Sequence, residues 1–107
     1  MSITITRGTT DDKLHAVVAE LERFQADHPA SAIDAYRYGR YTVRVRIVSP
    51  AFQGMTRGDR VQLVWPYFDP LDEETLSDVS TLLLLTPDEK ATSIASLEFD
   101  NPQPPVL

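Results

Sequence analysis

The residues of this chain best suited to chemistry are arginines gathered in one stretch. Residues 37–60 hold six arginines against a single acid, Asp59, so the stretch has a net charge of +5 in a chain whose net charge is −6. The six are Arg37, Arg40, Arg44, Arg46, Arg57 and Arg60. Guanidinium groups bind carboxylates and phosphates, often through two parallel hydrogen bonds. The stretch is therefore a candidate surface for a partner, either a protein or a nucleic acid.

Other residue types offer little chemistry. The absence of cysteine excludes disulfides, thiolate metal sites and cysteine nucleophiles within this chain. His15 and His28 each stand alone, with no second ligand at suitable spacing, and Ser49 and Ser80 lack the partners of a nucleophile. The acids Asp69, Asp72, Glu73 and Glu74 are explained more simply as the start of a helix than as a cation site. We expect no enzymatic activity, no metal and no cofactor.

An extended segment, Tyr41–Ser49, must position the central arginines. Side chains alternate between the two faces of a strand, so Arg40, Arg44 and Arg46 share one face and the valines share the other. Ile33–Tyr38 precedes it and is predicted to pair with it as a hairpin that turns at Gly39-Arg40.

The preferred register of this hairpin sets Tyr36 opposite Val43 and Ala35 opposite Arg44. It therefore predicts that the tyrosines lie with the core-directed valines, away from the arginines. Stacking platforms for bases need aromatic rings and cations on the same surface. The register and the acidic pI of 4.7 both disfavour nucleic-acid binding.

The remaining patterns predict helices on either side of this hairpin and a further strand. Apolar residues at helical spacing predict a helix over about 11–27, and Thr56 is placed to cap a helix over 57–65 whose stripe includes Trp65 and Phe68. The other predicted elements are a short strand at Ser2–Thr6, a helix over 70–78 capped by Asp69, a strand at Ser80–Thr86 carrying Leu82–Leu85, and a helix started by the capping box Thr86–Glu89. Residues 92–99 fit either a helix or a strand. We expect one domain over 1–99, an exposed proline-rich tail over 100–107, and a cytoplasmic location.

Several short motifs resemble the BolA family, a relative of the class II KH architecture, over roughly residues 41–90. They are the strand Val43–Ser49, the loop Ser49-Pro50-Ala51-Phe52-Gln53-Gly54, the helix start Arg60–Trp65, and the helix end and strand Leu76–Thr86. The resemblance implies an α+β fold, an α-β-β-α-β two-layer sandwich to which residues 2–6 would add a strand. Counting that strand also allows a ferredoxin-like β-α-β-β-α-β pattern, and its place at the centre or the edge of the sheet stays open.

The chain departs from this family where the family binds metal. Asp59 stands where the family has a histidine, and Tyr38-Gly39-Arg40 contains no cysteine or histidine. Borderline metals prefer thiolate and imidazole ligands, so sharing an iron–sulfur cluster with a glutaredoxin is not expected.

We therefore expect a BolA-like protein that acts through protein–protein contacts, with another protein or a second copy of itself as partner. The candidate partner surface comprises Arg40, Arg44, Arg46, Leu83 and Leu85. The alternative is a nucleic-acid-binding regulatory module, with Arg37, Arg40, Arg44, Arg57 and Arg60 as the contacts.

Overall fold

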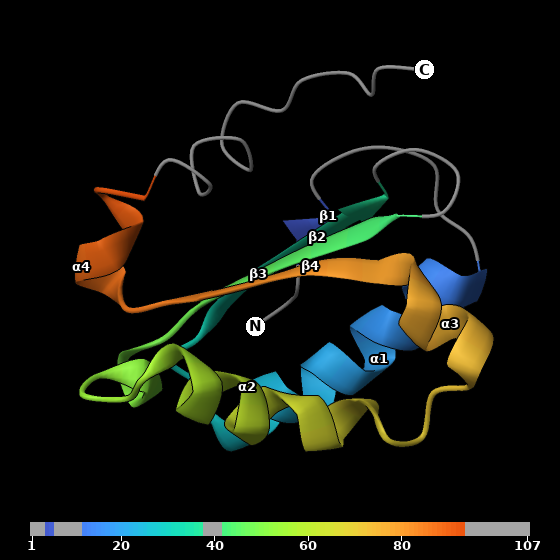
Figure 1. Ribbon diagram of the computed structural model, residues 1–107, viewed down its shortest axis with the longest axis horizontal. Coiled ribbons are helices and arrows are strands. Elements are labelled where there is room, and N and C mark those ends of the chain that lie inside the picture. Colours follow the sequence, from blue (N-terminus) through green and yellow to red (C-terminus); the bar gives the residue numbers. More distant parts are fainter. Residues whose placement is uncertain (1–3, 6–11, 38–41, 94–107) are drawn as a thin grey trace.

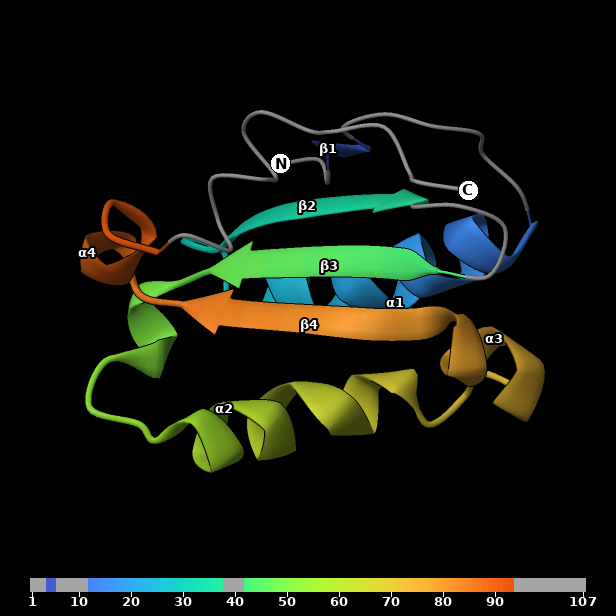
Figure 2. The ribbon, with the colours of Figure 1, turned by 45° about the horizontal axis from the view of Figure 1, so that its top comes forward.

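A four-stranded sheet forms one layer of the protein, in the order β1-β2-β3-β4 (Figures 1 and 2). The computed structural model describes residues 4–5, 12–37 and 42–93. The strands are β1 (Thr4–Ile5), β2 (Ala32–Arg37), β3 (Val43–Val48) and β4 (Val79–Leu85). β2 and β3 are antiparallel, whereas β1 runs parallel to β2 and β4 runs parallel to β3.

Helices cover one side of this sheet. Figure 1 shows α1 (Asp12–Asp27) and α2 (Arg57–Val64) below it, with α3 (Glu73–Asp78) at the end where β4 begins. α2 continues as a 3-10 turn, η2 (Trp65–Phe68), and a second 3-10 turn, η1 (Pro50–Phe52), follows β3. The short α4 (Pro87–Lys90) lies at the opposite end, after β4. The expected α+β class is confirmed.

The core lies between the helices and the sheet. The stripe predicted for the first helix is buried, with Leu14, Val17, Leu21 and Phe24 all inaccessible to solvent. Buried residues that join it from the rest of the chain are Ile33, Ala35, Val43, Val45, Ile47, Phe52, Val64, Phe68 and Leu84. Full burial of a Leu, Val or Phe side chain contributes about 2 kcal/mol each, so this cluster fixes the helices on the sheet.

The predicted hairpin register is wrong by one residue. Tyr36 pairs with Arg44 and Asp34 pairs with Arg46, so these four side chains lie on one face of the sheet, away from the helices. The predicted register would instead have set Asp34 against Val45, on the apolar face. The observed register keeps that face apolar and gives each arginine a polar neighbour. The turn itself, residues 38–41, lies outside the described residues.

The helices α2 and α3 each begin directly after a residue whose side chain caps the helix N-terminus. The Thr56 Oγ1 accepts a hydrogen bond from the Asp59 N–H at 3.1 Å, as predicted for the start of α2. α3 begins later than predicted, because the Asp72 carboxylate accepts from the Thr75 N–H at 2.8 Å and Asp69 is not its cap. Pro66 coincides with the change from α-helix to the η2 turn, as expected for a residue that lacks an N–H donor.

The placement of the N-terminal strand, which the sequence left open, is settled. Thr4 and Ile5 pair with Asp34 and Ala35, at the edge of the sheet and not at its centre. Thr92 and Ser93 belong to no helix or strand. Residues 94–99 and the tail predicted for 100–107 lie outside the described residues.

Candidate functional site

The arginines on the outer face of the sheet are held by β2. The Arg46 guanidinium lies 2.9 Å (Nε) and 2.5 Å (Nη2) from Asp34 Oδ2, and the residue is only 4% exposed. The Arg44 Nη1 donates to the Tyr36 hydroxyl at 3.1 Å, and Tyr36 is fully buried. Of the predicted partner surface, Arg46 is thus part of a buried ion pair and Arg44 is half-buried. Arg40 lies outside the described residues.

Arg37 points to the helix side, where it joins another ion pair. Its Nη1 lies 3.0 Å from Asp78 Oδ2, and both side chains are buried. The Lys13 ammonium of α1 approaches the same Asp78 oxygen at 3.9 Å and donates to Glu74 at 2.6 Å. The hydrogen bond to Glu74 is the main reason that the pKa of Lys13 is raised. Arg37 therefore links β2 to α1 and α3 and is not available to a nucleic acid.

A groove between α2 and β4 brings together residues from both predicted sets. We call it the α2–β4 groove, and its volume is 340 Å³. Its lining comprises Arg57, Arg60, Val61, Leu82, Leu83, Leu84, Leu85, Glu89, Thr92 and Ser93. Leu83 and Leu85 come from the predicted partner surface, and Arg57 and Arg60 come from the predicted nucleic-acid contacts.

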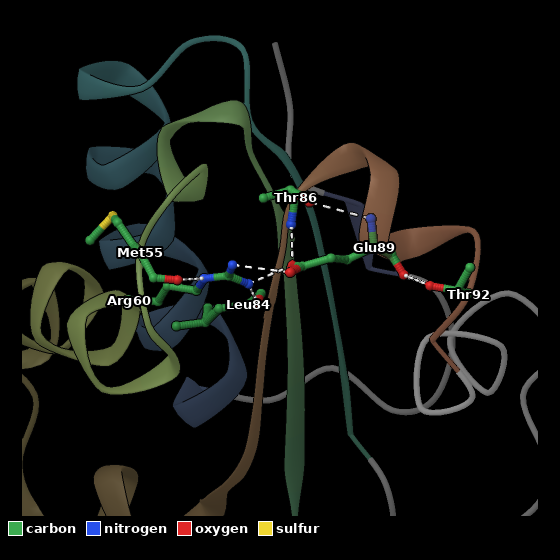
Figure 3. A network of polar contacts seen from close by, with 6 residues as sticks. All are labelled: Met55, Arg60, Leu84, Thr86, Glu89 and Thr92. Carbon is green, nitrogen blue, oxygen red and sulfur yellow. Dashed lines mark hydrogen bonds and ion pairs between the residues drawn. The ribbon is translucent and has the colours of Figure 1, made fainter.

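Arg60 lines this groove and is the centre of a network of polar contacts (Figure 3). Its guanidinium donates to the Met55 carbonyl at 3.1 Å, to the Leu84 carbonyl at 3.0 Å and to both Glu89 oxygens at 2.5 and 3.1 Å. The hydrogen bonds between Arg60 and Glu89 lower the pKa of Glu89 to about 2, with a smaller contribution from the Thr86 N–H, and they raise the pKa of Arg60. The Thr86–Glu89 capping box predicted from the sequence is present.

The outer row of α2 extends the groove with apolar surface. Arg57, Val61 and Trp65 follow one another at intervals of four residues, so they lie on one side of the helix. Val61 is 36% exposed and Trp65 is 41% exposed, and they are the large apolar side chains recorded as exposed in the described part of the chain. As members of one apolar stripe, Trp65 and Phe68 were both expected in the core. Phe68 is buried, whereas Trp65 is exposed, and the two rings meet edge-on at a centroid distance of 5.6 Å. We call Arg57, Val61 and Trp65 the α2 row.

Neither the ion pair of Glu89 nor the exposure of Val61 and Trp65 was predicted from the sequence. Apolar residues at helical spacing show which side chains lie on the same side of a helix. They do not show how many of those side chains the sheet covers. Glu89 was recognised only as a capping residue. Its second role depends on Arg60, which lies 29 positions earlier in the chain.

Other candidates from the sequence have ordinary structural roles. His15 is exposed, and the His28 ring stacks on Phe24 at a centroid distance of 4.4 Å. The Ser49 Oγ accepts from the Ala51 N–H, which starts η1. Residues 12–37 and 42–93, with 4–5, contain no group of three or more His, Asp or Glu placed to hold a metal ion.

No helix in the described residues is both long enough and apolar enough to cross a bilayer. Comparison of the chain with protein-family models, with curated proteins and with solved structures finds no match in any of the three.

Proposed function

We propose that this chain is a non-enzymatic, BolA-like protein that acts through protein–protein contacts, and that it binds its partner through the α2 row and the α2–β4 groove. The observation that carries the proposal is the pair of exposed apolar side chains, Val61 and Trp65, beside a groove with an arginine at its rim. Tryptophan and arginine are the residues most enriched among those that dominate interface energies.

The order of the elements supports the BolA-like part of the proposal. From α1 onward the chain forms a helix, an antiparallel strand pair, a helical segment and a strand parallel to β3. This is the α-β-β-α-β order that the resemblance implies. The edge position of β1 favours an added strand on that order over the ferredoxin-like alternative.

The groove serves this function better than the arginine face does. Arg46 is buried and engaged with Asp34, so a partner could reach its guanidinium only by displacing the Asp34 carboxylate. The α2 row needs no such rearrangement. Leu83 and Leu85 keep their predicted part in partner binding, but as lining residues of the groove.

The experiment compares the wild type with two groove variants and a matched control. Proteins captured by the wild-type chain from its natural cells are identified, purified and titrated by calorimetry against wild type, Val61→Glu, Trp65→Ala and Ala19→Glu. Ala19 is exposed on α1, so its variant introduces the same charge away from the groove. We expect the affinity for the partner to fall at least about tenfold in Val61→Glu and in Trp65→Ala and to stay unchanged in Ala19→Glu.

Two outcomes would contradict the proposal. Equal binding by all four proteins removes the groove as the contact site. If no captured protein binds in purified form and light scattering shows a monomer at every concentration, protein–protein contact itself is removed as the function.

A further inference from the structure

We infer that the α2–β4 groove accepts an extended, acidic segment of a partner protein, which adds as a strand to the outer edge of β4. This inference rests on the proposed protein-binding function and specifies the chemistry of the partner. Strand addition combines main-chain hydrogen bonds at a sheet edge with side-chain contacts on alternate residues.

The hydrogen bonds of β4 identify its open edge. The Leu85 carbonyl accepts from Ser49 N at 2.8 Å, on the side of β3, and the Leu84 carbonyl accepts from Arg60 on the other side. Because successive residues of a strand direct their main-chain groups to opposite edges, the N–H and C=O of Leu82 point away from β3, as those of Leu84 do. β4 is the last strand in the sheet order, and no described strand pairs with this edge.

Two features limit the length of the added strand. At one end the register between β3 and β4 is irregular at Val43/Arg44, which disturbs the edge near Ser80. At the other end the Arg60 guanidinium already occupies the Leu84 carbonyl. The open edge is therefore centred on Leu82 and suits a short segment.

The charges along the groove favour an acidic occupant. Arg60 is neutralised by Glu89, but Arg57 is exposed at the rim and makes no ion pair within the described part of the chain. A carboxylate from the segment can pair with Arg57, and an aliphatic side chain two residues away can pack on Val61. A second copy of β4 fits less well, because Val79–Leu85 contains no acid that could meet Arg57.

The probes are three acetylated, amidated heptapeptides. The first, Thr-Asp-Thr-Val-Thr-Asp-Thr, presents both acids and the valine on one side of a strand in either direction. The second replaces both aspartates by lysine. The third, Thr-Thr-Asp-Val-Asp-Thr-Thr, has the same composition, but its acids point to the side opposite the valine.

Each peptide is titrated into the full 15N-labelled chain and followed by NMR. The first peptide is expected to shift the amides of α2 and β4, to slow hydrogen exchange at the Leu82 N–H, and to bind about tenfold more tightly than the lysine peptide. Arg57→Glu should reverse the preference between these two peptides. Arg23→Glu, which changes the net charge equally on α1, should leave it unchanged.

Several results would overturn the inference. Equal binding of the first peptide and the lysine peptide, or of the first peptide and the third, would show that the position and sign of the charges do not matter. Shifts at these amides that depend only on protein concentration would point to self-association. Shifts caused by a short single-stranded oligonucleotide in place of the peptide would point to a nucleic-acid site. If no peptide binds but the captured partner binds in a Val61-dependent way, this inference falls and the proposed function stands. If neither binds, both fall.

Discussion

Arg46 and Arg60 each form an ion pair with a carboxylate, but the two pairs differ in how far they are exposed to solvent. The side chains of Arg46 and Asp34 are 5% and 17% exposed, whereas those of Arg60 and Glu89 are 11% and 44% exposed. An ion pair shielded from water becomes costly when one partner is removed, because the remaining charge stays buried. An ion pair in contact with water contributes less and is screened by salt.

We predict that Arg46→Met lowers the free energy of unfolding by about 3 kcal/mol, because it leaves the Asp34 carboxylate buried without its cation. Urea denaturation measures this loss. The double variant Asp34→Leu/Arg46→Met, which removes both charges, should recover most of it. Arg57→Met serves as the exposed control and should stay within about 0.5 kcal/mol of wild type. An Arg46→Met protein as stable as this control would show that the pair is not structural.

The Glu89 carboxyl gives the fold a defined response to acid. Its pKa falls from the ordinary 4.5 to about 2 in the folded chain, mainly through the hydrogen bond from Arg60. The depressed pKa means that the stabilisation is fully present above pH 4.5 and is lost as the pH falls towards 2. We predict that Glu89→Gln lowers the thermal midpoint at neutral pH and that this difference from wild type disappears near pH 2. A difference that is constant across this range would exclude the ionised carboxylate as its cause.

At the scale of the elements, two glycines near the start of α2 have opposite roles. Gly54, in the turn after η1, has a φ of +77°, a conformation that side-chain-bearing residues adopt only at a cost. Gly58 lies inside α2, and a Cβ added there would approach no atom closer than 4.0 Å.

We predict that Gly54→Ala destabilises the fold by about 1 kcal/mol and that Gly58→Ala stabilises it by up to about 1 kcal/mol. The added methyl group at position 54 meets nothing within 4 Å, so its effect comes from the backbone angle alone. Denaturation of the two variants side by side provides the measurement. Effects of the same sign would mean that the turn before α2 does not require the positive φ.

These elements also show how far local patterns reach. The α1 stripe, the Thr56 cap and the Thr86–Glu89 capping box involve residues within a few positions of one another, and all three were predicted correctly. The hairpin register was not, since the turn residues allow more than one alignment. The deciding contacts are Arg46 with Asp34 and Arg44 with Tyr36, which form only after the strands have paired.

At the scale of the whole molecule, the basic stretch 37–60 is divided among three environments. The Arg37 side chain points to the helix layer, Arg44 and Arg46 lie on the outer sheet face, and Arg57 and Arg60 lie at the groove. The concentration of arginines in this stretch was visible in the sequence. Its division was not, because the acids that hold Arg46, Arg60 and Arg37 are 12, 29 and 41 positions away.

This division bears on the nucleic-acid alternative. Of the five arginines predicted as contacts, Arg37 and Arg60 are held by carboxylates and Arg44 donates to Tyr36. Arg57 is exposed, and Arg40 lies outside the described residues. Affinity for nucleic acid depends on several phosphate contacts made together, and the net charge of −6 opposes approach of a polyanion.

We therefore predict no measurable binding of short oligouridine or oligothymidine at about 0.15 M salt, where charges are screened beyond ~8 Å. Fluorescence anisotropy of labelled strands, repeated at lower salt, provides the measurement. Any weak association at low salt should be lost in Arg57→Glu and kept in Arg23→Glu, because Arg57 lies at the groove and Arg23 does not. Binding that persists at about 0.15 M salt would contradict this prediction. If the logarithm of its association constant also falls steeply with the logarithm of the salt concentration, several phosphate contacts are made. The arginines now assigned to ion pairs would then have to exchange their carboxylates for phosphates.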